Sequence, residues 1–267
     1  MCIVRHVLAA TAVLACTAAN AEQTLHWPLD TIDHLQPHDV AVTAEPFQGR
    51  DSVRVRLLSD LDGGDSNTLA VIADSQFTNG CIEVDVNSRV DPDANFIVRR
   101  FARGFVGIAF RVAPDVSRFE ALYVRPLNGR DPDPERRAHA VQYFSYPDWS
   151  FKRFRDEAPG QYEAGADIGP DEWLHLRIDV QGDRAALSIN DAPLPALVVK
   201  DLKLGAEAAG GIGLWVDTGT EAHFSNLRVT RETSCSGQAS AQHDGNVTRG
   251  AIAALDGAVD ERPPAFR

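Results

Sequence analysis

The stretch that decides the fold runs from residue 106 to residue 112 and reads Val106-Gly107-Ile108-Ala109-Phe110-Arg111-Val112. Large apolar side chains at the even positions alternate with small or polar side chains at the odd positions. Such a period of two is typical of a β-strand with one buried face, because successive side chains of a strand point to opposite sides. The stretch therefore predicts a strand whose large apolar residues, Val112 included, face a core.

The same alternation recurs along most of the chain. The clearest further examples are residues 82–87, 173–180 and 211–217. The remaining strand candidates are 40–44, 52–58, 68–73, 118–126, 139–146, 184–190, 195–202 and 222–230. Clusters of Gly, Pro, Asn and Asp separate these segments, and no window of a dozen residues between 22 and 232 shows a helical period. We expect an all-β fold in which two antiparallel sheets pack their apolar faces together as a β-sandwich.

Length and charge narrow the class of protein. The chain has 267 residues, 44% of them apolar and 24% charged, which suits one globular β-sandwich domain. Its 26 Lys and Arg residues against 38 Asp and Glu residues give a formal net charge of −12. Nucleic-acid binding relies on basic surface, so we expect no nucleic-acid partner. The sequence predicts no transmembrane segment, because no apolar run reaches about 20 residues, and it defines no oligomeric state.

The first 21 residues have the pattern of a signal peptide. Arg5 precedes a small, apolar run at 7–19, and Ala19-Asn20-Ala21 offers a cleavage site. We therefore expect export, to the periplasm or as a secreted protein. A second interpretation stays open, in which Val13-Leu14-Ala15-Cys16 is a lipoprotein box and Cys16 carries a lipid.

The predicted domain spans residues 22–232, and a tail follows at 233–267. The tail is polar, lacks alternation and cannot bury enough apolar surface to offset its chain entropy, so we expect disorder there. After export the mature chain keeps two cysteines, Cys81 and Cys235. In an oxidising compartment these two residues either form a disulfide or stay as separate thiols.

Seven segments carry a likeness to a known superfamily. They are Phe77-Thr78-Asn79-Gly80, Ile82-Glu83-Val84-Asp85, Gly107-Ile108-Ala109-Phe110-Arg111, Phe119-Glu120-Ala121-Leu122-Tyr123-Val124-Arg125-Pro126, Glu172-Trp173-Leu174-His175-Leu176-Arg177-Ile178, Gly211-Ile212-Gly213-Leu214-Trp215 and Phe224-Ser225-Asn226-Leu227-Arg228-Val229. Over residues 38–230 the chain resembles the concanavalin A-like lectin/glucanase superfamily, in particular laminin G-like and 3-keto-disaccharide hydrolase-like domains. The resemblance implies a jelly roll of two curved sheets, a ligand on the concave sheet and a carbohydrate partner.

The resemblance also implies where catalytic acids would lie. Glucanases of this superfamily carry Glu-x-Asp-x-x-Glu on one strand, and here the matching segment at 120–125 keeps only the first acid, Glu120. Glu163 is the other candidate. Glycoside hydrolysis generally uses two carboxyl groups flanking the scissile bond. The sequence thus leaves open whether the protein is an enzyme.

A polar and aromatic set of residues forms the predicted ligand site. Its members are Arg111, Tyr123, Arg125, Asn128, Gln142, Tyr146, Trp149 and Arg155. Sugars offer hydroxyls to planar donors and acceptors and apolar faces to rings, which this mixture suits. The small residues Gly107, Ala109, Gly211 and Gly213 predict a shallow sheet face, with room for a ligand beside Arg111 and Trp215. The alternative is that the aromatic side chains are core and the arginines pair with neighbouring acids.

Asp60, Asp62 and Asp65 form the one candidate metal site. Calcium prefers clustered carboxylate and carbonyl oxygens, although Asp and Gly clusters are also ordinary turn residues. Apart from calcium, the sequence predicts no cofactor. Three functions stay open: binding of a saccharide on the concave sheet, cleavage of a glycan or disaccharide, and a structural envelope module without a small ligand.

Overall fold

The computed structural model describes residues 23–59 and 64–231, all of which belong to one structural unit. The predicted signal peptide at 1–21 and the predicted tail at 233–267 lie outside the described residues, as do Cys16 and Cys235. Within the described ranges no helix has the length and apolar character needed to cross a membrane.

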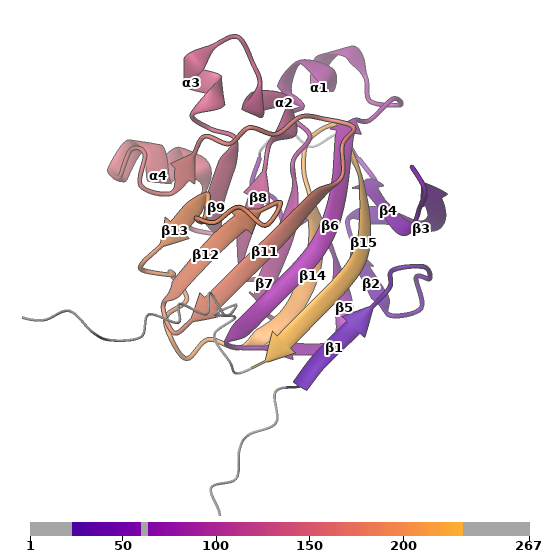
Figure 1. Cartoon of the computed structure of the whole chain (residues 1–267), viewed down its shortest axis with the longest axis vertical. Coiled ribbons are helices and arrows are strands. Elements are labelled where there is room, and N and C mark those ends of the chain that lie inside the picture. The colour runs from indigo at the N-terminus through magenta and orange to yellow at the C-terminus, as the bar shows by residue number, and fades with distance from the viewer. Residues whose placement is uncertain (1–22, 60–63, 232–267) are drawn as a thin grey trace, which may run out of the picture. The chain divides into compact units, whose positions relative to one another are not determined.

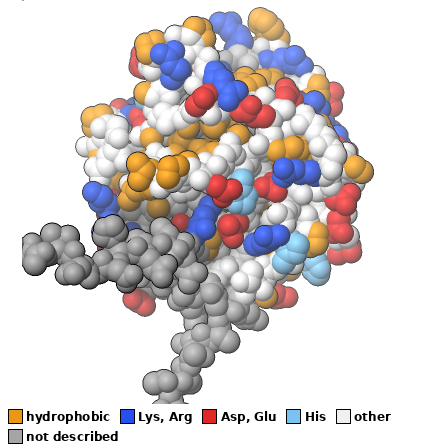
Figure 2. All heavy atoms as spheres, viewed as in Figure 1, with side chains coloured by type: hydrophobic (Ala, Val, Ile, Leu, Met, Phe, Trp, Pro, Cys, Tyr) orange, Lys and Arg blue, Asp and Glu red, His pale blue; other side chains and the backbone are white. Residues whose placement is uncertain are grey.

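Two antiparallel sheets pack as a sandwich, which confirms the predicted all-β fold (Figure 1). The first sheet has eight strands. Their order is β13 (Leu197–Val199), β12 (Arg184–Ile189), β11 (Leu174–Gln181), β6 (Gly80–Val90), β15 (Thr220–Arg231), β4 (Arg50–Leu57) and β3 (Val40–Phe47), and β1 (Gln23–Trp27) also pairs with β15. Figure 2 looks onto the outer face of this sheet, where charged side chains of both signs and histidines mingle.

The second sheet has seven strands and positions the candidate site. Their order is β10 (Glu163–Ala164), β9 (Val141–Tyr146), β8 (Phe119–Val124), β7 (Val106–Val112), β14 (Gly210–Val216), β5 (Leu69–Phe77) and β2 (Leu35–His38). Every segment that the sequence predicts as a strand overlaps a strand of the structure. The sequence did not predict β1, β2 or the two-residue β10.

Burial between the sheets follows the predicted alternation. Ile82, Val84 and Val86 of β6 are fully buried and lie beside the buried apolar residues of β11. Ile108 of β7 and Leu122 of β8 belong to the same core cluster from the opposite sheet. Full burial of one such side chain contributes about 1.5–3 kcal/mol, so this shared core holds the two layers together.

The alternation breaks at Arg111. Its φ of 55° lies in the left-handed region, and the pairing of β7 with β14 shifts register next to it. A β-bulge of this kind turns the following residues to the other face. Val112 consequently packs with the outer cluster of the seven-stranded sheet instead of the core, and the prediction that grouped it with Ile108 was wrong.

Four short helices lie in the connections around the seven-stranded sheet (Figure 1). They are α1 (Phe96–Phe101), α2 (Pro126–Gly129), α3 (Pro134–Arg137) and α4 (Phe151–Glu157). Asn95, Asp133 and Ser150 cap the first turns of α1, α3 and α4 with side-chain oxygens. Each helix is shorter than two turns, so a search for helical periodicity over a dozen residues does not detect it.

Candidate functional site

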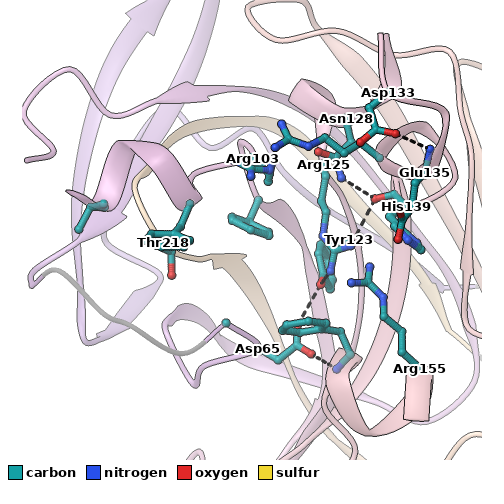
Figure 3. Close-up of a pocket in the computed structure, with 16 residues that line it drawn as sticks. Asp65, Arg103, Tyr123, Arg125, Asn128, Asp133, Glu135, His139, Arg155 and Thr218 are labelled. Carbon is teal, nitrogen blue, oxygen red and sulfur yellow. Dashed lines mark hydrogen bonds between the residues drawn. The ribbon is translucent and has the colours of Figure 1, made fainter. Parts of the chain in front are cut away.

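A pocket of about 560 Å³ lies where β8 ends and the helices gather (Figure 3). Its walls come from α1 and the following turn, from β8 and α2, from the α3 region, from α4, and from two loops. The lining residues are Gly64, Asp65, Val98, Phe101, Arg103, Phe105, Tyr123, Arg125, Asn128, Asp133, Glu135, Arg136, His139, Phe151, Arg155 and Thr218. A volume of this size suits a small organic ligand.

Three side chains on the pocket wall form a chain of hydrogen bonds. Arg125 donates from Nη2 to the Tyr123 hydroxyl at 2.6 Å, and that hydroxyl donates to Asp65 Oδ1 at 2.9 Å. The other carboxylate oxygen of Asp65 accepts the backbone N–H of Phe151. The chain joins the end of β8 to the start of α4, and Figure 3 shows it running through the middle of the site.

Aromatic rings surround the Arg125 guanidinium. Its Cζ lies 5.6 Å from the ring centroid of Phe105, 5.1 Å from that of Tyr123 and 5.5 Å from that of Phe151. Arg125 is only 4% exposed, and its Nε has no hydrogen-bond partner. The stacked rings and the bond to Tyr123 fix the orientation of this planar cation.

Burial changes the protonation of two groups in the pocket. Burial raises the pKa of Asp65 to about 6, against the opposing effects of the Phe151 N–H and of Arg125. Burial also lowers the pKa of His139, with the positive charge of Arg155 acting in the same direction. Acidification from neutral pH therefore makes this pocket more positive.

One wall of the pocket exposes apolar surface to solvent. Phe101, the last residue of α1, is 61% exposed and lines the pocket. Arg103 follows it and donates from Nη1 to the carbonyl oxygens of Arg100 and Ala102 at 3.0 and 2.6 Å. A solvent-exposed ring and a partly buried cation thus line the same pocket.

The structure brings four of the eight predicted ligand residues into this pocket: Tyr123, Arg125, Asn128 and Arg155. Asn128 is buried and donates to the His139 carbonyl oxygen at 3.0 Å, which closes the turn after β8. All four combine polar or aromatic groups of the kind that bind sugars.

The other four predicted ligand residues lie outside the pocket lining. Gln142 is fully buried on β9 and donates to two backbone carbonyl oxygens. Tyr146 stacks on Phe119 with ring centroids 5.2 Å apart. Trp149 stacks on Phe154 and packs against the core between the sheets. For these aromatic residues, packing within the sandwich accounts for the observed contacts.

Arg111 lies toward the far end of the sheet from Tyr123. Tyr123 pairs in register with Gly107, and Arg111 lies four residues further along the strand, roughly 13 Å at the usual strand rise. Arg111 is 1% exposed and donates to the carbonyl oxygens of Thr78, Gly182 and Gly205 and to Glu120. These contacts tie three turns to the end of the sandwich, so the two arginines Arg111 and Arg125 do not share one surface.

The outer face of the seven-stranded sheet is filled by the protein's own side chains. A Cβ at Gly107 would lie 2.4 Å from Tyr123 Cβ, and a Cβ at Gly213 would lie 2.4 Å from Leu69 Cδ1. Trp215 is fully buried, with its ring centroid 4.6 Å from that of Tyr123. The small residues accommodate neighbouring side chains, so the prediction of a shallow face with ligand space beside Trp215 was wrong.

Both acids considered for catalysis are engaged by arginine. Glu120 is fully buried and also accepts hydrogen bonds from the Tyr143 hydroxyl and the Leu204 N–H. Glu163 accepts two hydrogen bonds from Arg155 at its Oε2, at 2.9 and 2.7 Å, and is 8% exposed. Neither lines the pocket, although Glu163 holds the pocket arginine Arg155 in place.

Asp65 is the one residue of the candidate calcium site that the structure describes. Its two oxygens accept hydrogen bonds from Tyr123 and Phe151, while Asp60 and Asp62 lie outside the described residues. Within residues 23–59 and 64–231, no three His, Cys, Asp or Glu side chains gather as metal ligands.

Cys81 at the start of β6 is disulfide-bonded. The other three cysteines of the chain lie outside the described residues. The pairing of Cys81 with Cys235 therefore stays a prediction.

Sequence reasoning missed most of the helical wall of the pocket. Phe101 and Arg103 belong to α1 and its following turn, and Asp133, Glu135 and Arg136 belong to α3 and its cap. Two local signals could have found these helices. Asn95 stands before an apolar run, and Asp133 stands before a proline, each a typical start of a helix.

No known protein-family model matches the sequence, and no curated protein matches it. Solved structures do match. A protein of unknown function with a galectin-like fold from Bacillus subtilis is 15% identical, with 78% of this chain and 94% of that chain covered and a TM-score of 0.50. The fold is a concanavalin A-like jelly roll. The family resemblance in the sequence is confirmed at the level of fold.

Two further matches have named activities. The carbohydrate binding module CBM66 from Bacillus subtilis is 18% identical, with 73% of this chain and 95% of that chain covered and a TM-score of 0.49. A Bacillus licheniformis β-glucanase is 13% identical, with 78% and 98% covered and a TM-score of 0.45.

Proposed function

We propose that this protein is an exported domain that binds a saccharide in the pocket at the end of β8. The observation that carries the proposal is the pairing of exposed aromatic surface with fixed polar groups around one cavity. Phe101 offers a ring to the apolar face of a sugar, and Arg103 offers N–H donors to its hydroxyls. The resemblance to a carbohydrate-binding superfamily points in the same direction.

The position differs from the one expected from the sequence. The outer face of the seven-stranded sheet is occupied by Trp215 and its aromatic neighbours, so we place the ligand at the sheet's end, between the helices. Arg125 and Tyr123 still belong to the site, as the wall against which the ligand lies.

Cleavage of a glycan or disaccharide is the second candidate, and Asp65 is the observation that favours it. A carboxyl group with a pKa of about 6 is suited to protonating a leaving group near neutral pH. However, Asp65 is 6% exposed, and each of its oxygens already accepts a hydrogen bond. Glu120 and Glu163, which would supply the second carboxylate, do not line the pocket, and each is paired with an arginine. We therefore favour binding over hydrolysis.

A glycan array followed by titration calorimetry tests the binding proposal. Phe101→Ala should weaken the affinity about tenfold, because the variant loses the stacking platform. Phe96→Ala is the matched control, since Phe96 belongs to the same helix, is 76% exposed and does not line the pocket. Equal affinities of the two variants, or an array without signal, would count against saccharide binding at this site. Release of reducing ends from a bound glycan would instead favour the enzyme.

A further inference from the structure

The pocket concentrates arginine in a protein of formal net charge −12. Four arginines line it, and two of them have acidic partners. Arg136 pairs with Asp131 at 3.3 Å, and Arg155 pairs with Glu163 at 2.7 Å.

The other two, Arg103 and Arg125, have no carboxylate oxygen within 4.0 Å in the part of the chain that the structure describes. The Nη1 of Arg103 donates only to backbone carbonyl oxygens. Arg125 reaches the nearest acid of its hydrogen-bond chain, Asp65, only through the Tyr123 hydroxyl. A partly or fully buried guanidinium without a direct counterion keeps a strong attraction for an anion.

Acids act on these two cations only without direct ion-pair contact: the charge of Asp65 acts on Arg125, and that of Asp131, which pairs with Arg136, acts on Arg103. Asp133 accepts the Glu135 N–H at 2.9 Å as the cap of α3. Both oxygens of Asp65 are engaged, and burial keeps this carboxyl group partly protonated in mildly acidic solution. Glu135 is exposed to solvent, where its charge is screened.

We propose that the saccharide bound by this pocket is acidic, with a carboxylate or sulfate group that lies against Arg103 while Arg125 adds its charge from the wall behind. This inference rests on the proposed function of the pocket as a saccharide site. Guanidinium groups match the geometry of carboxylate and sulfate oxygens, and charge-assisted hydrogen bonds are about twice as strong as neutral ones. Exposed Phe101 would contact the apolar face of the same sugar.

The test compares sugar chains that differ only in charge. The full chain is applied to an array that holds oligogalacturonates beside their methyl esters, and dextran sulfate beside dextran. We expect signals from the charged members only, weakened by high salt. Binding to the oligogalacturonates would identify a carboxylate as the acidic group that the pocket recognises, and binding to dextran sulfate would identify a sulfate ester.

The possible outcomes distinguish the preference for acidic saccharides from saccharide binding itself. Equal binding of charged and neutral members would overturn the acidic preference and leave saccharide binding standing. An array without any signal, extended to neutral and acidic glycans of other backbones, would overturn both.

Two variants test whether the charge of Arg103 binds the acidic group of the saccharide. Arg103→Gln should lower the affinity for the charged glycan about tenfold, as expected for the loss of a hydrogen bond to a charged group. Arg100→Gln removes the same charge from an exposed residue of α1 that does not line the pocket. This variant should retain the affinity for the charged glycan once salt screens long-range electrostatic effects. Equal losses in both variants at high salt would overturn the assignment. Because Arg103 is only partly buried, thermal unfolding should show both variants folded.

Discussion

Arg111 and Glu120 form an ion pair of 3.2 Å whose two side chains are both completely excluded from solvent. The pair lies between the sheets and the turns that close one end of the sandwich. Glu120 accepts a further hydrogen bond from the Tyr143 hydroxyl at 2.9 Å, so the buried charges are enclosed by polar partners. Such a network holds structure in place and offers no free surface to a ligand.

Breaking this pair should destabilise the protein strongly. Glu120→Gln leaves the Arg111 charge buried without a counterion, which typically costs about 3–5 kcal/mol. Urea unfolding measures the change. The double variant Arg111→Met/Glu120→Leu should recover part of the loss, since it removes both charges but leaves their hydrogen-bond partners without these bonds. A single variant as stable as the wild type would show that the pair is dispensable.

Saccharide affinity should rise as the pH is lowered from 7.5 to 5. Asp65, with a pKa of about 6, loses its negative charge over this range. Arg125 then faces an incoming anion without a competing acid. With the screening of bulk water, one such charge at about 4 Å is worth about 1 kcal/mol, or about fivefold in affinity.

Titration calorimetry at the two pH values checks this expectation. Asp65→Asn should bind the charged glycan equally well at both. Affinity that falls on acidification in the wild type would contradict the role given to Asp65.

Stability should fall as the pH drops from about 6.5 to about 4, owing to His223. This side chain is 2% exposed and stacks on Phe47, and burial lowers its pKa to about 4, with Arg89 and Arg54 acting in the same direction. The unfolded chain binds a proton below pH 6.5 and the folded chain does not. Protons therefore favour unfolding, by about 2 kcal/mol at pH 4.5.

The comparison with His223→Gln isolates this contribution. The variant starts with lower stability at pH 7, but its stability should decline less between pH 7 and pH 4.5 in urea unfolding. Parallel declines in the two proteins would indicate that other groups, such as Glu45 and Glu221 close to Nε2, neutralise the imidazolium.

Cys235 is the predicted disulfide partner of Cys81. Peptide mapping without reducing agent should recover the two residues in one linked fragment. A disulfide between Cys81 and Cys235 closes the long loop between these two residues. In the chain-entropy treatment such a crosslink contributes up to about 5 kcal/mol to stability, so Cys235→Ser should lower the unfolding temperature. Recovery of Cys81 linked to another cysteine would contradict the prediction.

The strands could be read from the sequence because their signal is local. Ile82, Val84 and Val86 alternate with polar residues, and any two-sheet packing that buries one of them buries all three. The helices were harder to predict from the sequence, since α2 and α3 have four residues each and are defined by caps and by their place against the sheet.

The candidate site was only partly predictable for the same reason. Tyr123, Arg125 and Asn128 are close in sequence, so their common location follows from one strand and its turn. Arg103 and Asp65 come from distant segments, and only the folding of the chain brings them to the same cavity. Arg111 was misplaced because one left-handed residue reverses the faces of a strand, and alternation alone does not reveal it.

Strand periodicity and turn residues act over a few neighbours, so the all-β class, the strand positions and the apolar face of most strands follow from the order of the amino acids. The pairing of the arginines follows only from the folded chain. That pairing depends on distances between segments far apart in the chain, and it separates Arg111, held by Glu120 inside the sandwich, from Arg103 and Arg125 at the pocket.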